Sequence, residues 1–192
     1  MRLVYAAAMA LVLTACGGAP PPQTGASALP AADDAPSAPW AEARRRRDEA
    51  AKLTPPSLPA DSSPPAVMSF MKESVPPWVK ARRAAVESCV EAFRDAAKQA
   101  PAPERSKALL EAAQAAMAFV EAYAHVSNDA ASALATDPAD KADLLKAFRE
   151  SEKPHAELAQ DVLRECVASD ASGAPTEAVD ECRAMLAKFS EH

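Results

Sequence analysis

The residues best suited to chemistry in this chain of 192 residues are two histidines, His125 and His155. Glu152 and His155 have the Glu-x-x-His spacing that supplies iron ligands in ferritin-like helical bundles. Such a site needs a second copy of the motif and two further glutamates, and the segment 121–125 has a different spacing. We therefore expect no metal site and no cofactor. The alternative is a carrier that binds a metal or a non-covalent haem through His125 and His155.

Other catalytic machinery is also missing from the pattern. Only one glycine, Gly173, follows residue 25, so glycine loops that cradle phosphates are absent from the region expected to fold. A serine nucleophile would need a histidine with an orienting partner, and neither histidine lies in such a context. Glu157, Asp161 and Glu165 form a ridge at four-residue spacing, which we interpret as a solvated helix face. We expect a protein that is not an enzyme.

The charge of the chain bears on its partners. Its 27 acidic and 21 basic side chains give a formal net charge of −6. Proteins that bind nucleic acid present a basic surface, so we expect no nucleic-acid partner.

The first sixteen residues have the pattern of a bacterial export signal. Arg2 supplies one positive charge, and residues 3–13 form an uncharged run that is too short to span a bilayer. The residues that follow, Leu13-Thr14-Ala15-Cys16, resemble the lipobox of bacterial lipoproteins. The resemblance implies a signal peptide over 1–15 and lipidation of Cys16, for example with palmitate, as a membrane anchor. The alternative is an ordinary secretory signal that Cys16 happens to follow.

The resemblance also bears on localisation. Gly17 stands where inner-membrane members of that family carry Asp, which favours the outer membrane. We expect the domain to face the periplasm or the cell surface.

Proline divides the rest of the chain into two regions. Of the 18 prolines, 13 fall between residues 20 and 77. Residues 16–65 hold too few large apolar side chains to offset the entropy of folding, so we predict a largely disordered Pro/Ala-rich linker. Residues 66–192 are enough for one modest core and form the expected domain. Within the linker, the proline-free segment 40–53 predicts a short charged helix, which is either solvated or a basic docking patch for a polyanion.

From residue 66 onward the apolar residues recur with the period of an α-helix. One helix is expected between Pro77 and Pro101, and another from about residue 104 to residue 134, with a bend at 127–129. Asp137 is expected to cap a third helix, which breaks or kinks at 151–154 because Pro154 lacks an amide hydrogen. A last helix follows residue 175. The sequence therefore predicts an all-α fold, an antiparallel bundle of about four main helices.

Three cysteines remain if Cys16 is lipidated, so only one intramolecular disulfide can form. Cys166 and Cys182 lie eight residues before and after Ala174, at equal height in a helical hairpin that turns there. We favour the bridge between them. Bridges from Cys89 to either partner stay open as alternatives, because Cys89 also lies on an apolar helix face. If Cys89 is left over, we expect a buried free thiol or, as an alternative, an intermolecular bridge.

The apolar cluster at the start of the domain is the candidate contact with another protein. It consists of Val67, Met68, Phe70 and Met71, which either cover the core or form an exposed patch. Together these patterns predict a lipid-anchored protein of the cell envelope. Its helical domain is expected to be a non-catalytic binding or structural module with an envelope protein as partner.

Overall fold

The computed structural model describes residues 38–169 and 176–189 of the chain. These residues form six α-helices and no strand, so the prediction of an all-α fold is confirmed. The predicted signal peptide (residues 1–15), Cys16 and residues 17–37 lie outside the described residues. The helices are α1 (Ala38–Lys52), α2 (Pro64–Glu73), α3 (Val75–Gln99), α4 (Ala102–Leu134), α5 (Pro138–Ala168) and α6 (Glu177–Phe189).

Proline marks the beginning of several helices. Helices α2 to α5 each carry a proline in the first two positions, where its missing N–H removes no helical hydrogen bond. Asp137 caps α5 as predicted: its Oδ1 accepts hydrogen bonds from the amides of Ala139 (2.8 Å) and Asp140 (3.0 Å).

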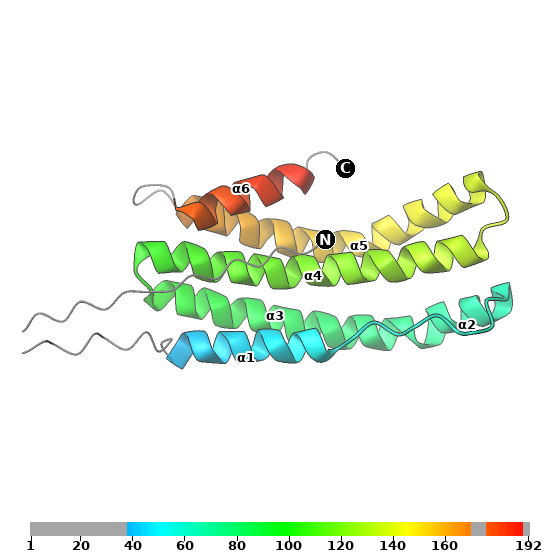
Figure 1. Cartoon of the computed structure of the whole chain (residues 1–192), viewed down its shortest axis with the longest axis horizontal. Coiled ribbons are helices and arrows are strands. Elements are labelled where there is room, and N and C mark those ends of the chain that lie inside the picture. Colours follow the sequence, from blue (N-terminus) through cyan, green and yellow to red (C-terminus); the bar gives the residue numbers. More distant parts are fainter. Residues whose placement is uncertain (1–37, 170–175, 190–192) are drawn as a thin grey trace, which may run out of the picture. The chain divides into compact units, whose positions relative to one another are not determined.

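Pro154 does not divide the third predicted helix in two. Helix α5 runs without interruption from Pro138 to Ala168, and Ser151 lies inside it rather than capping a new helix. Its hydroxyl group donates a hydrogen bond to the carbonyl of Ala147 (3.4 Å), one turn earlier. Figure 1 shows the axis of α5 changing direction about midway, which is the effect expected of an interior proline.

Helix α4 is the centre of the bundle. It packs against α3 on one side and α5 on the other, and the helices from α3 to α6 alternate in direction (Figure 1). Helix α6 packs on α5 and α4, and α2 packs on α3 and α4. The surface of α4 that meets these neighbours is made largely of small residues, namely the fully buried Ala108, Ala112, Ala113, Ala116, Ala130 and Ala131. Larger side chains fill the space between the helices, among them Phe93, Phe119, Val86, Val90, Val162 and Leu163.

The folded unit begins earlier than the predicted domain boundary at residue 66. The compact unit spans residues 35–192, and α1 packs against α3 within it. The helix expected over 40–53 is therefore present, but Trp40, Ala43 and Ala50 are buried in the core instead of being surrounded by solvent. The contact relies on alanine and one tryptophan, which do not form the stripe of large apolar residues that marks an amphipathic helix.

Candidate functional site

The two histidines lie in different surroundings. His155 is buried on α5, with its ring 4.6 Å from the ring of Phe119 and 6.0 Å from that of Tyr123. His125 is exposed. Because Tyr123 and His125 are two positions apart on α4, their side chains leave that helix in roughly opposite directions. The histidines therefore do not face each other, and residues 38–169 and 176–189 contain no group of three or more potential metal ligands.

The surroundings of His155 favour the neutral form of its imidazole. Its Nδ1 atom has no hydrogen-bond partner, and burial lowers the pKa of His155. Arg83 on α3 lowers this pKa further, while Glu87 on the same helix opposes the shift. Glu152, one turn earlier on α5, is half-buried, and this burial raises the pKa of its carboxyl group, against the influence of Arg149.

Acid should destabilise the domain in part through His155. Its pKa is lower in the folded chain than in the unfolded chain, so the unfolded state binds a proton first as the pH falls below about 6.5. Stability linked to His155 is therefore complete above that pH and is lost below it. When the pH is lowered from about 7.5 to about 5, we expect the free energy of unfolding to fall less in His155→Leu than in the wild type, as measured by urea unfolding. His125→Leu, at an exposed position, should behave like the wild type; an equal loss in all three proteins would contradict the prediction.

The predicted disulfide is present. Cys166 on α5 and Cys182 on α6 are bonded, with their Cα atoms 6.3 Å apart, and both side chains are fully buried. The remaining cysteine that the structure describes, Cys89, is a buried free thiol, and burial raises its pKa to about 11.

The apolar cluster at the start of the predicted domain separates into core and surface. Val67 (0 % exposed) and Phe70 (7 % exposed) are buried against the bundle, and Met71 is half-buried. Of the two alternatives left open for this cluster, burial in the core holds for Val67 and Phe70. Met68 is 43 % exposed and is the one residue of the four that faces solvent.

Met68 lines a groove of about 480 Å³ where α2, the end of α4 and the start of α5 meet. We call it the Met68 groove. Leu134 and Leu144 are half-buried beside Met68, and Ala147 is exposed. The carboxylates of Asp140 and Asp143 complete the lining. Asp140 also accepts a hydrogen bond from Thr136. Of the residues that line the groove, only Met68 was predicted from the sequence, because the others lie on helices whose packing order the sequence does not give.

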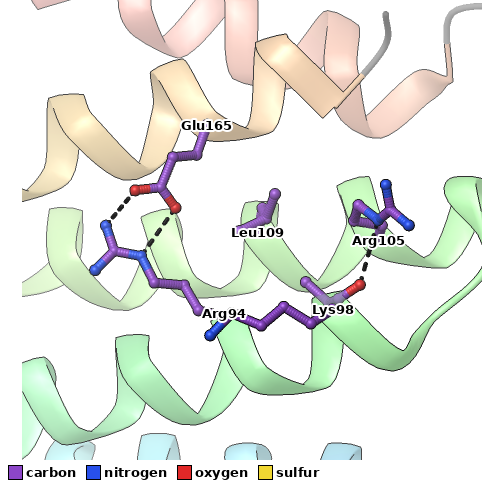
Figure 2. Close-up of a pocket in the computed structure, with 6 residues that line it drawn as sticks. Arg94, Lys98, Arg105, Leu109 and Glu165 are labelled. Atoms are coloured by element: carbon purple, nitrogen blue, oxygen red, sulfur yellow. Dashed lines mark hydrogen bonds and ion pairs between the residues drawn. The ribbon is translucent and has the colours of Figure 1, made fainter. Parts of the chain in front are cut away.

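A second groove, of about 490 Å³, lies between α3, α4 and α5 (Figure 2). Three of its lining residues are basic, but two of them already have carboxylate partners. Arg94 donates to Glu165 from Nε at 2.8 Å and from a second nitrogen, and Lys98 donates to Asp95 at 2.9 Å. Arg105 donates to the carbonyl of Ala97 at 3.3 Å. This groove therefore offers little unpaired positive charge to an anionic ligand.

The four consecutive arginines of α1 are also ion-paired. Arg45 and Arg46 pair with Glu42 in their own helix, and Arg47 pairs with Glu111 on α4. Arg44 pairs with the same glutamate. With their charges matched inside the domain, these side chains are poorly suited to the basic docking patch that sequence analysis left open.

Comparison with protein-family models, with curated proteins and with solved structures found no match to this chain. Among the helices that the structure describes, none has the length and apolar character needed to cross a membrane.

Proposed function

We propose that this chain is a lipid-anchored protein of the bacterial cell envelope, whose helical domain is a non-catalytic module that binds another protein. The anchor is supported by the sequence of residues 1–16, in which Leu13 opens and Cys16 closes a segment that resembles a lipobox. Residues 17–37 would then connect the lipid to the domain, and Gly17 favours the outer membrane.

Intact mass spectrometry of the protein extracted from its own membranes in mild detergent tests the anchor. The expected mass is that of residues 16–192 with acyl groups added and two hydrogens removed for the disulfide. A chain without acyl groups would overturn the anchored part of the proposal and leave the binding part standing.

The Met68 groove carries the binding part of the proposal. Met68 is the large apolar side chain most exposed among the described residues, and half-buried Leu134 and Leu144 lie beside it. Methionine adapts its shape to different neighbours, which suits a contact surface. Asp140 and Asp143 on the same groove favour a partner that presents a basic residue next to an apolar one.

Photo-crosslinking in intact cells tests the groove. A photoreactive residue at position 68 should crosslink to one envelope protein, and the same residue at exposed His125 should not. Asp143→Lys should abolish the crosslink with a change in stability within about 0.5 kcal/mol, because Asp143 is exposed and reversal of its charge repels a basic partner. The same capture from both positions, or a crosslink that survives Asp143→Lys, would contradict this assignment of the surface.

A further inference from the structure

Helix α1 buries few large apolar side chains against the bundle. Of its 15 residues, only Trp40, Ala43 and Ala50 are buried. The Trp40 ring meets the Phe93 ring edge-on at 6.2 Å. Alanine side chains bury little apolar area, so Trp40 supplies most of the hydrophobic attachment.

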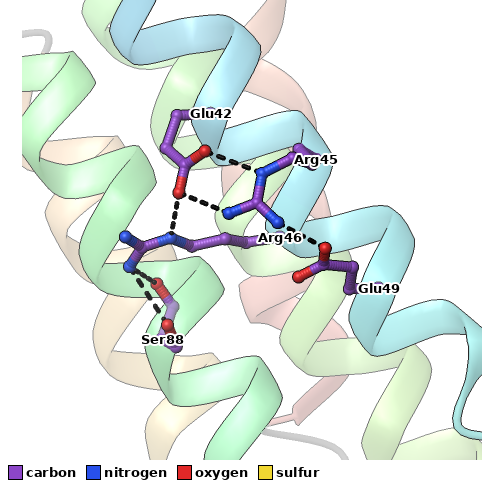
Figure 3. Close-up of polar contacts among 5 residues, drawn as sticks. All are labelled: Glu42, Arg45, Arg46, Glu49 and Ser88. Atoms are coloured by element: carbon purple, nitrogen blue, oxygen red, sulfur yellow. Dashed lines mark hydrogen bonds and ion pairs between the residues drawn. The ribbon is translucent and has the colours of Figure 1, made fainter.

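The remaining attachment is polar and depends mainly on one residue of α4. Glu111, whose side chain is only 12 % exposed, accepts hydrogen bonds from Arg44 at 2.9 Å and from Arg47 at 2.8 Å. Arg46 adds a hydrogen bond to the hydroxyl of Ser88 on α3 at 3.1 Å (Figure 3). Removing Glu111 would leave both of its arginines without this carboxylate.

Other charges of α1 are satisfied within the helix itself. Glu42 pairs with Arg45 and Arg46, and Arg45 also pairs with Glu49 (Figure 3). Hydrogen bonds from Arg45 and Arg46 lower the pKa of Glu42 to about 2. These pairs connect residues three and four positions apart within α1, so they involve no partner on another helix.

The segment that connects α1 to α2 is not helical. Residues 53–63 have no regular structure, and the carbonyl of Leu53 accepts hydrogen bonds from Trp78 at 3.0 Å and Arg82 at 3.4 Å. These bonds hold the end of the segment next to α1, so α1 can separate from α3 and α4 while α2 stays in place.

Cys89 lies beneath this helix. It is fully buried on α3, and the charged groups that act on its thiol include Arg46, Arg47 and Asp48 of α1 together with Glu111. While α1 is closed, the thiol is protected by burial and by its raised pKa of about 11. Separation of α1 would expose it to solvent.

We propose that α1 is a releasable strap that opens as a unit while α3, α4 and α5 stay folded, and that Glu111 is its latch. Opening uncovers the face of α3 that carries Cys89 and Phe93, so the domain has two states with different apolar surfaces. Folded proteins commonly open one element at a time, without global unfolding. Salt shifts this equilibrium toward the open state, because the latch is made of charge pairs that mobile ions screen.

The reaction of Cys89 with the thiol reagent 5,5′-dithiobis(2-nitrobenzoic acid) tests the proposal. The full chain is used with Cys16→Ser, which leaves Cys89 as its one free thiol because Cys166 and Cys182 are bridged. Glu111→Gln should speed labelling about tenfold, since it removes the shared carboxylate of two partly buried arginines. Glu87→Gln is the matched control, because Glu87 is a partly exposed glutamate of α3 that pairs with Arg83 on its own helix.

Two further measurements identify the opening reaction. Raising NaCl from about 0.05 M to about 1 M should speed labelling in the wild type and have little effect in Glu111→Gln. The dependence of labelling on urea should be much shallower than that of global unfolding, because opening of α1 exposes less surface. Labelling that follows global unfolding in both proteins, or an unchanged rate in Glu111→Gln, would overturn the proposal.

Discussion

Replacing Phe119 with alanine should lower the free energy of unfolding by about 3–5 kcal/mol. Phe119 is 2 % exposed, and its ring lies 5.9 Å from the ring of Trp78 and 4.6 Å from that of His155. It therefore joins α3, α4 and α5 at one point of the core. Truncation removes the buried area and leaves a cavity that backbone shifts in three helices would have to fill. The loss is a large part of the stability of a typical domain.

Urea unfolding followed by circular dichroism measures this loss. Phe148→Ala is the matched control, because Phe148 is also a helical phenylalanine but is only half-buried on α5. We expect it to lose about 1 kcal/mol, in the ordinary range of single substitutions. If Phe119→Ala lost no more stability than Phe148→Ala, the aromatic cluster around His155 would not be the centre of the core.

Removing the Cys166–Cys182 bridge should cost about 3 kcal/mol of stability, the value expected for a loop of this length. The two cysteines are 16 positions apart. Helix α6 has only 13 residues and is too short to be stable alone, so it depends on this bridge and on buried Val179. The double variant Cys166→Ala, Cys182→Ala should melt about 6–12 °C below the wild type.

A thermal melt of the double variant beside Cys89→Ala tests this expectation. Cys89→Ala also removes buried sulfur but leaves the bridge intact, so it separates the effect of the cross-link from that of core packing. Equal melting temperatures for the two variants would show that the bridge contributes nothing beyond packing.

Local sequence signals predicted several features of this fold. Asp137 before Pro138 predicted a capped helix start, because the chemistry of a helix N-terminus depends on adjacent residues. The choice of Cys166 and Cys182 followed from their equal distance from a turn and from their apolar faces. The lipidation of Cys16 stays a prediction, since it lies outside the described residues.

Features that depend on tertiary packing were missed. The ion pairs of Arg44 and Arg47 with Glu111 join residues more than sixty positions apart, so no local sequence pattern predicts them. Without them, α1 could not be assigned to the domain. Pro154 was expected to break or kink this helix, and α5 changes direction without breaking; Ala159, Val162 and Leu163 beyond it are fully buried. Their packing offsets the local cost of proline, an example of tertiary contacts overriding propensity.

The candidate surface was only partly predicted for the same reason. Met68 and Phe70 are two positions apart on one short helix, so one faces solvent and the other faces the core. Both residues were candidates for the patch because the sequence shows that apolar residues cluster here. It does not show which side of the helix packs against the rest of the bundle.

The buried alanines of α4 constrain how this protein can change over evolutionary time. Ala108, Ala112 and Ala116 repeat every four residues with almost no exposed surface, so a larger side chain at any of them would push neighbouring helices apart. The exposed charges around them are under no such restriction. Divergent descendants of this chain would therefore keep small residues at these positions while their surface residues change. Small residues repeated every four positions are the feature by which distant relatives could be recognised.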